Sequence, residues 1–134
     1  MNVTGQCLCG AVRFTGTPTA ARSISVCHCG QCRRWATGPV FACRMEGGVT
    51  LTKDEGLTWF ASSSEGERGF CRHCGTSLFW RQPGTGLDCA VSVGALDPGH
   101  GLSIASHIWI EDKPDFYDFA DDAPRLTAAE ARGG

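Results

Sequence analysis

The chain has 134 residues, which is long enough to bury a hydrophobic core within one domain. Its formal net charge is −2, whereas proteins that bind nucleic acid usually carry a basic surplus, so a nucleic-acid partner is not expected. No stretch approaches the roughly 18 apolar residues of a membrane-spanning helix, and the N-terminus lacks the basic start and apolar run of a signal peptide. We therefore expect a cytoplasmic protein without a membrane partner.

Short apolar or alternating runs recur along the chain between turn residues. The separators are rich in Gly, Pro, Ser and acidic residues, as in Gly16-Thr17-Pro18 and Glu46-Gly47-Gly48. Regularly spaced short strands with such separators favour an antiparallel, mainly β architecture with little helix. The predicted strands are Ala11–Thr15, Ser23–Cys27, Val40–Arg44, Val49–Thr52, Leu57–Ala61, Arg68–Phe70, Ser77–Arg81, Asp88–Val93 and Ile104–Ile110.

Helix signals are confined to two places. Gln31–Ala36 predicts one turn, and Thr127–Arg132 predicts a frayed terminal helix. No interior linker or long-period repeat divides the chain. We therefore expect a single domain over residues 3–126, followed by a C-terminal tail over residues 127–134.

An acidic segment, Glu111–Asp122, precedes that tail. It holds six of the 14 acidic residues of the chain, and a run of this kind is usually a solvated face. Here Phe116, Tyr117 and Phe119 interrupt the charges. The aromatic residues predict that the segment packs back onto the sheet.

Seven of the nine cysteines fall into three tight clusters. These are Cys7-Leu8-Cys9, Cys27-His28-Cys29-Gly30-Gln31-Cys32 and Cys71-Arg72-His73-Cys74. Cysteines one residue apart are poorly placed to form a disulfide with each other, whereas neighbouring thiolates can converge on zinc, which takes about four such ligands. In a chain without an export signal, this pattern favours a metalloprotein over a disulfide scaffold.

The last cluster, Cys71-x-x-Cys74, has the form of a zinc knuckle. A redox pair would instead be expected between a strand and a helix, and here a strand is predicted to follow. Spacing alone leaves open which cluster completes the site. The simplest combination joins the pair to Cys7 and Cys9, which gives a closed four-thiolate site of the structural kind.

The middle cluster then supplies three thiols, Cys27, Cys29 and Cys32. Three thiolates can hold a zinc ion and leave a fourth position for water or a substrate thiol. Such a centre carries a formal charge of −1, and it suits a soft sulfur ligand better than the generation of hydroxide. Two alternatives stay open: a closed structural site completed by His28 or a distant residue, and a redox cluster without metal.

The histidines offer few other ligands. His28 and His73 lie inside the cysteine clusters, where we expect the intervening residue to point outward. His107 alternates with its neighbours in a predicted strand, so its side chain could face a cavity. A single histidine is more often a satisfied polar residue than a metal ligand.

Arg33 and Arg34 directly follow the third cysteine of the middle cluster. A guanidinium there could bind a substrate carboxylate through two hydrogen bonds, or it could simply balance the thiolate charge. Cys43 and Cys89 lie within predicted strands and are expected to act as small, inert core residues.

Five blocks of the sequence resemble the glutathione-dependent formaldehyde-activating enzyme (GFA)/CENP-V family, and the similarity as a whole runs from about Val3 to Arg125. The blocks are Cys7–Phe14, Cys27–Arg33, Phe70–Thr76, Val91–Asp97 and His107–Pro114. The resemblance implies an Mss4-like (β-tent) fold with two zinc ions per chain, the occupancy of the second being left open. It assigns a structural zinc to the first and last cysteine pairs and a second zinc to the middle triplet. These ligands are Cys7, Cys9, Cys71 and Cys74 for the first ion, and Cys27, Cys29 and Cys32 for the second.

The activity implied by the resemblance joins formaldehyde to glutathione as S-(hydroxymethyl)glutathione, a carbon–sulfur lyase reaction in reverse. We therefore expect a zinc-dependent lyase that acts on thiol–aldehyde adducts, with a small thiol such as glutathione and an aldehyde as partners. The middle triplet would be catalytic, and no residue is identified as a general acid or base. The alternative is a zinc-stabilised, Mss4-like protein-binding module without catalysis. The natural substrate and the oligomeric state are not predicted.

Overall fold

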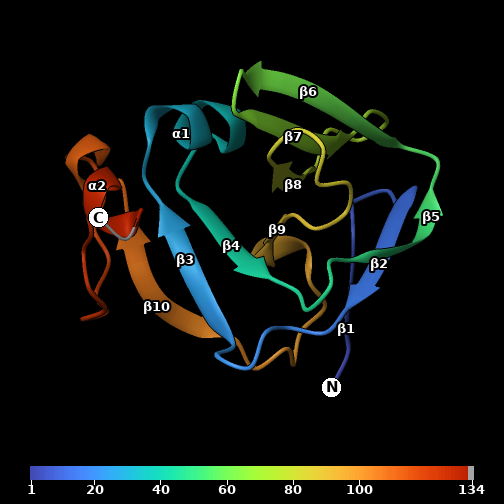
Figure 1. The fold of residues 1–134 in the computed structure, drawn as a ribbon, viewed down its shortest axis with the longest axis horizontal. Helices are drawn as coiled ribbons and strands as arrows, with labels where there is room; N and C mark the ends of the chain where they lie inside the picture. Colours follow the sequence, from blue (N-terminus) through green and yellow to red (C-terminus); the bar gives the residue numbers. More distant parts are fainter. Residues whose placement is uncertain (133–134) are drawn as a thin grey trace.

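The computed structural model describes residues 1–132, and its strands form two sheets with short helices beside them (Figure 1). The smaller sheet has three antiparallel strands in the order β1-β2-β5. Its strands are β1 (Val3–Gln6), β2 (Val12–Gly16) and β5 (Thr50–Asp54). Side chains along β1 alternate between buried and exposed, so this sheet buries one face and leaves the other in solvent.

The larger sheet has seven strands in the order β10-β3-β4-β9-β8-β7-β6. Its strands are β3 (Ser23–Cys27), β4 (Val40–Arg44), β6 (Leu57–Ser63), β7 (Gly66–Cys71), β8 (Ser77–Arg81), β9 (Ala90–Ser92) and β10 (Ser103–Ile108). All neighbours pair antiparallel except β10 and β3, which run parallel. This parallel pair corrects the expectation of a wholly antiparallel architecture.

The predicted mainly β, Mss4-like fold is confirmed, and each predicted strand has a counterpart, though several boundaries shift. The run Ile104–Ile110 ends as a strand at Ile108, because Trp109 adopts the left-handed conformation (φ 53°) and residues 110–112 form a 3-10 turn. Strand β1 was not predicted. Its Gly5 disfavours a strand by propensity, but a Cβ at this position would lie 2.5 Å from the ring of Phe14.

The two helices are short and have defined caps. Helix α1 (Gly30–Ala36) begins at Cys29, whose sulfur accepts a hydrogen bond from the backbone N–H of Cys32, and ends at Thr37 in the left-handed conformation. Helix α2 (Ala128–Ala131) begins with a capping box between Thr127 and Glu130. The last two residues of the predicted tail lie outside the described residues. In the described range 1–132, no helix is long and apolar enough to cross a membrane.

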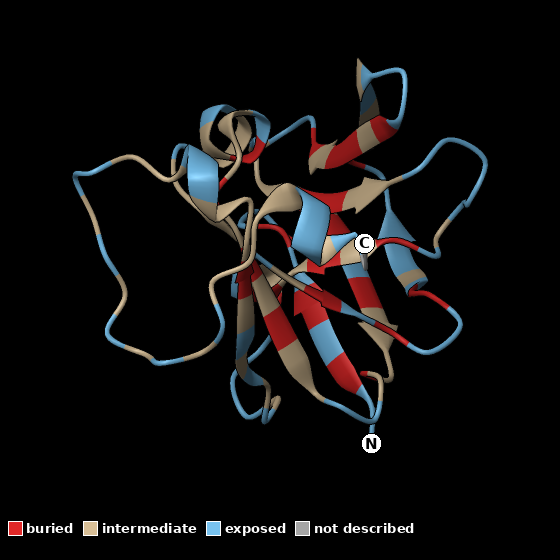
Figure 2. Ribbon diagram, turned by 60° about the vertical axis from the view of Figure 1, so that its left-hand side comes forward, coloured by how far each residue is buried: buried red, intermediate tan, exposed pale blue. Residues whose placement is uncertain are grey.

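The core lies where the two sheets meet. Phe14 of the smaller sheet packs edge-on against Phe79 of the larger one, with ring centroids 5.1 Å apart. Figure 2 shows the buried residues recurring along the strands, as expected for strands with one face in the core. Cys43 and Cys89 are 4% and 0% exposed and belong to this core, which confirms their predicted placement.

Candidate functional site

Four thiols meet where the smaller sheet contacts the end of β7, and we call them the first cluster. Cys7 and Cys9 lie in the turn between β1 and β2, and Cys71 and Cys74 lie at the end of β7 and in the turn that follows. All four sulfur atoms lie within 4.8 Å of one another. The sulfur of Cys9 is 3.7 Å from that of Cys7 and 3.8 Å from that of Cys71.

These separations fit a tetrahedral metal centre. With zinc–sulfur bonds of about 2.3 Å, tetrahedral geometry places sulfur ligands about 3.8 Å apart. The four-thiol combination that spacing favoured is therefore the one that the fold brings together. Because it joins segments about 65 residues apart in the chain, a bound ion would connect the smaller sheet to the larger one.

Two turns, each with a left-handed glycine after the second cysteine, present these thiols. In each, the backbone N–H of a left-handed glycine donates back to the carbonyl of the first cysteine: Gly10 to Cys7 at 3.2 Å, and Gly75 to Cys71 at 2.7 Å. Both glycines have φ of 81°, a conformation that residues with a Cβ rarely adopt. This explains the glycine that directly follows the second cysteine of each pair.

Hydrogen bonds favour the thiolate form of Cys7 and Cys74, whereas contacts with the other cysteines raise the pKa of Cys9 to about 11. The Thr76 hydroxyl lies 3.2 Å from the Cys74 sulfur, and hydrogen bonds from the Thr76 side chain and backbone lower the pKa of Cys74 to about 5. The backbone N–H of Val12 donates to the Cys7 sulfur at 3.3 Å. Thiolates are the forms that bind metal, so the first cluster is prepared for a soft cation.

The second cluster consists of Cys27, Cys29 and Cys32. Cys27 ends β3, Cys29 caps α1, and Cys32 lies in the first turn of that helix. Their sulfurs lie within 4.8 Å of one another, and no fourth His, Cys, Asp or Glu among residues 1–132 joins the group. The local order strand, cap and helix therefore gathers three ligands and no more.

The three thiols hold charge unequally. Hydrogen bonds from Cys27 and Cys32 lower the pKa of Cys29 to about 2, while the same contacts raise the pKa of Cys27. One negative charge is thus shared easily among the three sulfurs, and further ionisation needs a cation. This donor set fits a soft divalent metal such as zinc.

His28 does not complete the second cluster, contrary to one of the alternatives. It was also expected to point outward, but it is fully buried, with 0% of its surface exposed. Its Nδ1 lies 2.8 Å from the Tyr117 hydroxyl, and its Nε2 lies 2.8 Å from Nδ1 of His107. The segment after β10 folds over His28 and encloses it, which a pattern of neighbouring cysteines could not reveal.

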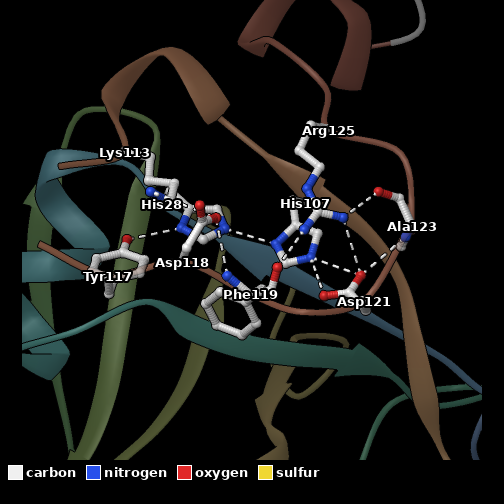
Figure 3. A network of polar contacts seen from close by, with 9 residues as sticks. All are labelled: His28, His107, Lys113, Tyr117, Asp118, Phe119, Asp121, Ala123 and Arg125. Atoms are coloured by element: carbon white, nitrogen blue, oxygen red, sulfur yellow. Dashed lines mark hydrogen bonds and ion pairs between the residues drawn. The ribbon is translucent and has the colours of Figure 1, made fainter. Parts of the chain in front are cut away.

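Asp121 closes this chain of hydrogen bonds (Figure 3). Both of its carboxylate oxygens lie 3.0 Å from Nε2 of His107. Arg125 donates to the same carboxylate at 3.3 Å and to the carbonyl oxygen of Phe119 at 3.1 Å, so it ties the loop together. His107, which was expected to face a cavity, is instead 1% exposed and faces this network.

Burial and charge act in opposite directions on this network. Burial lowers the pKa of His28 to about 4, with smaller contributions from His107, Lys113 and Arg125. Burial alone would raise the pKa of Asp121, but hydrogen bonds from His107 and Ala123 and the charges of His107 and Arg125 together outweigh it, and the pKa falls below its ordinary value. A neutral His28 and an ionised Asp121 are therefore the favoured forms near pH 7.

Aromatic rings pack around the two histidines. The Phe119 ring contacts His107 edge-on with centroids 4.9 Å apart, and Tyr117 stacks on His28 at 5.6 Å with an interplanar angle of 19°. The predicted packing of the acidic segment onto the sheet is thus confirmed for these two residues. Phe116 remains 76% exposed.

Arg68 of β7 was not predicted as part of the site, although it reaches the second cluster. It is 4% exposed and donates to the Cys32 sulfur at 3.7 Å and to the Gln31 side chain at 3.4 Å. Its Nε donates to the Ser62 hydroxyl at 3.2 Å, and its guanidinium lies 5.1 Å from the centre of the Trp35 ring. One property of the sequence could have indicated such a residue: a zinc ion bound by three thiolates has a formal charge of −1, and a nearby cation would balance it.

The two arginines proposed to bind substrate lie in different surroundings. Arg33 is half-buried, and its Nε has no hydrogen-bond partner among the described residues. Arg34 is exposed. Of the two, only Arg33 has a buried donor atom, its Nε, and Arg33 directly follows Cys32 of the second cluster.

Two shallow hollows adjoin the clusters. The larger, of about 430 Å³, is lined by Cys7 of the first cluster and by the turn after β9. The smaller, of about 160 Å³, reaches Ala36 at the end of α1. Ser77, Ser92 and Gly94 line both, so the hollows adjoin each other and form a groove from Cys7 to Ala36.

Comparison with known proteins places this arrangement in a family. A family model described as glutathione-dependent formaldehyde-activating enzyme matches residues 2–112. A Schizosaccharomyces pombe protein named an uncharacterised lyase is 30% identical over 126 residues, which cover 94% of this chain and 91% of the yeast protein. A Halomonas elongata protein named "Putative glutathione-dependent formaldehyde-activating enzyme" is 26% identical, over 88% of this chain and 81% of that protein.

A solved structure shares the fold. The crystal structure of a Rhodobacter sphaeroides protein superposes with a TM-score of 0.59 at 20% sequence identity, covering 91% of this chain and 98% of that one. At this identity the likeness concerns the fold alone. Because the family model covers most of the chain and includes all seven clustered cysteines, the chain belongs to the glutathione-dependent formaldehyde-activating enzyme family.

Proposed function

We propose that the chain is a zinc-dependent carbon–sulfur lyase that forms and cleaves adducts of a small thiol and an aldehyde. The observation that carries this proposal is the second cluster: three converging thiols, with no fourth ligand among residues 1–132. Both nitrogens of the adjacent His28 have other partners. The names of the family model and of the Halomonas elongata relative support glutathione as the thiol and formaldehyde as the aldehyde, and the name of the Schizosaccharomyces pombe relative supports a lyase.

The two clusters would have different roles. Cys7, Cys9, Cys71 and Cys74 would hold a structural zinc, since all four positions are filled by protein. The three thiols of the second cluster would hold the other zinc, which when bound supplies one further coordination position suited to a sulfur ligand.

Arg68 matches the charge of the second cluster. Three thiolates around one divalent cation leave a net charge of −1, and the buried guanidinium of Arg68 is the cation in contact with Cys32. A buried charge is tolerated when it is paired and hydrogen-bonded, and Arg68 has Gln31 and Ser62 as additional partners. The cluster and Arg68 together form a neutral unit.

Arg33 and the groove would position the substrate. A guanidinium beside the second cluster can bind a carboxylate of a glutathione-like thiol. The groove that begins near α1 has room for the extended part of such a molecule.

The reaction itself requires few groups. In the synthetic direction a carbon–sulfur bond forms between the thiolate and the carbonyl carbon, and the carbonyl oxygen gains a proton to become a hydroxyl. In the lyase direction that hydroxyl loses its proton, the carbonyl forms, and the electron pair of the carbon–sulfur bond returns to sulfur. Holding thiol and aldehyde together supplies proximity, which is a large part of catalysis for a two-reactant addition.

The metal content of single variants tests this proposal. Wild-type protein, Cys27→Ser, Cys29→Ser, Cys32→Ser and Cys71→Ser are compared by zinc analysis and by thermal unfolding, with the core variant Cys89→Ala as a control. We expect two zinc ions per wild-type chain, and one in the second-cluster variants while the fold persists.

Catalysis is measured on the same proteins. Exchange between formaldehyde, glutathione and S-(hydroxymethyl)glutathione is followed by NMR exchange spectroscopy. We expect acceleration by the wild type and its loss in the three second-cluster variants. A folded, two-zinc wild type that neither binds glutathione nor accelerates exchange would contradict the lyase proposal and favour a zinc-stabilised binding module.

A further inference from the structure

A continuous series of hydrogen bonds leads from Asp121 in the loop after β10, through two buried histidines, to Tyr117 (Figure 3). It runs from Asp121 through His107 and His28 to the hydroxyl of Tyr117, with heavy-atom distances of 3.0, 2.8 and 2.8 Å. The histidines are 1% and 0% exposed. Buried polar groups are stable only when their hydrogen bonds are made, so this chain has few alternative arrangements.

When both imidazoles are neutral, the carboxylate at the end sets the direction of every hydrogen bond. An ionised Asp121 can only accept, so Nε2 of His107 must donate to it. Asp121 is also paired with Arg125, so the loop already matches its negative charge with a positive one. With His107 neutral, its Nδ1 carries no hydrogen and accepts from Nε2 of His28.

The same reasoning extends to the tyrosine. Once Nε2 of His28 carries the ring hydrogen, its Nδ1 is an acceptor, and the hydroxyl of Tyr117 must donate to it. The only hydrogen of this hydroxyl is then engaged. Its oxygen is left with free lone pairs and can only accept from any further partner.

Tyr117 lies beside the second cluster. Its ring stacks on His28, which separates Cys27 from Cys29 in the sequence. Burial raises the pKa of Tyr117, and the neighbouring charged groups that act on it are Arg33 and Cys27. Tyr117 therefore lies near enough to Cys27 and Arg33 to be affected by their charges.

We propose that the chain Asp121–His107–His28 fixes the Tyr117 oxygen as a hydrogen-bond acceptor for the hydroxyl group of a thiol–aldehyde adduct. His107 and Asp121 are positioning residues, because they act through His28 and not on the substrate. The substrate half of this inference depends on the function proposed above. It selects adducts that carry a hydroxyl, such as hydroxymethyl thioethers, over simple S-alkyl thioethers, which have no hydrogen to donate.

The direction of the hydrogen bonds from Asp121 to Tyr117 is tested first, on the zinc-loaded full-length protein without substrate. Nitrogen-15 NMR of the histidine rings distinguishes a hydrogen on Nε2 from one on Nδ1. We expect both His28 and His107 to carry it on Nε2. A hydrogen on Nδ1 of His28, or on both nitrogens of either ring, would overturn the proposal.

Asp121→Asn provides the matched variant. An asparagine amide can donate to Nε2 of His107, and this reverses every hydrogen bond in the chain without removing any. We expect both histidines to change to the Nδ1–H form, so that Tyr117 accepts from His28 and its own hydroxyl hydrogen is free to be donated to a ligand. In serine proteases the analogous Asp→Asn change keeps the geometry and lowers the rate by about 10⁴-fold through the wrong tautomer. Unchanged tautomers in this variant would show that Asp121 does not set the direction.

The role of the tyrosine is tested with Tyr117→Phe, and with Phe116→Leu as a control on the exposed neighbour. We expect Tyr117→Phe to slow the exchange of S-(hydroxymethyl)glutathione about tenfold, the worth of a single hydrogen bond of about 1.4 kcal/mol. The Kd of S-methylglutathione, which has no hydroxyl, should change less than about twofold. An equal loss for both ligands would overturn the proposal. If the wild-type protein binds neither ligand, the proposed function is wrong. The tautomers of His28 and His107 would still show the direction of the hydrogen bonds.

Discussion

The two cysteine clusters solve the same coordination problem with different parts of the chain. The first joins two similar glycine-containing turns from different sheets, and all four positions are thiols. The second takes three thiols from the six residues 27–32 and surrounds them with groups that are not metal ligands. Those groups, Arg68 and the hydrogen-bonded chain ending at Tyr117, come from distant strands and loops. We propose that the site that links the sheets serves stability and that the three-thiol site with its neighbouring polar groups serves chemistry.

Removal of a first-cluster ligand should have the largest effect. Cys71 is fully buried, and its cluster connects the two sheets. Cys71→Ser should therefore abolish binding of the structural metal. Because the free energy of metal binding at such a site contributes directly to folding, the variant should unfold or lose roughly 5 kcal/mol or more of stability. Circular dichroism and zinc analysis measure both consequences. A folded Cys71→Ser chain with an unchanged melting temperature would contradict the structural role assigned to the first cluster.

Cys29→Ser should separate metal from fold. We expect loss of one zinc ion per chain and of the exchange activity, with a melting temperature close to that of the wild type, because helix α1 can still be capped by a serine oxygen. Calorimetry and zinc analysis check this. If this variant unfolds as Cys71→Ser does, the second cluster is also structural.

Arg68→Met should weaken metal binding at the second cluster without removing a ligand. Loss of a group that hydrogen-bonds a ligand typically lowers metal affinity about 10- to 100-fold, and Arg68 donates to Cys32. Competition with a chromogenic chelator measures the affinity. Arg34→Met, which alters an exposed arginine nearby, is the control and should leave it unchanged.

The pH dependence of stability should show a smaller effect from His28. Its pKa is about 4 in the folded chain against an ordinary value of 6.5, so between these values the unfolded state binds more protons. The stability due to neutral His28 is therefore complete above about pH 6.5 and is lost as the pH falls toward 4. NMR titration of its ring protons should show no protonation down to about pH 5. A midpoint near 6.5 would show that His28 is not enclosed as described.

The sequence allowed the cysteine clusters to be predicted because metal ligands in turns are close together in the chain. It did not reveal Arg68, which lies 36 residues from Cys32, or the pairing of Tyr117 with His28 across 89 residues. Local patterns carry no information about which distant side chain approaches a turn. For the same reason the outward orientation expected for His28 was wrong, since its burial depends on a loop near the other end of the chain.

The strands and their pairing were also predictable only where the pattern is local. Alternation of apolar residues predicted most of the larger sheet, whereas β1 contains Gly5 and has only four residues, too few for a clear period. The parallel pairing of β10 with β3 could not be predicted from turn residues, because parallel neighbours need a long connection and not a tight turn.

That parallel pair has a consequence for the order in which the molecule is completed. Every cysteine of both clusters lies within the first 74 residues, but β10 pairs Ile108 with Cys27 and so brings His107 and the following loop to the second cluster. During synthesis the first cluster has all its ligands when residue 74 emerges. The second has its thiols even earlier but gains its polar enclosure only when the last strand docks. A chain that ends before β10 would therefore retain the thiols and Arg68 but lack the groups proposed to select the substrate.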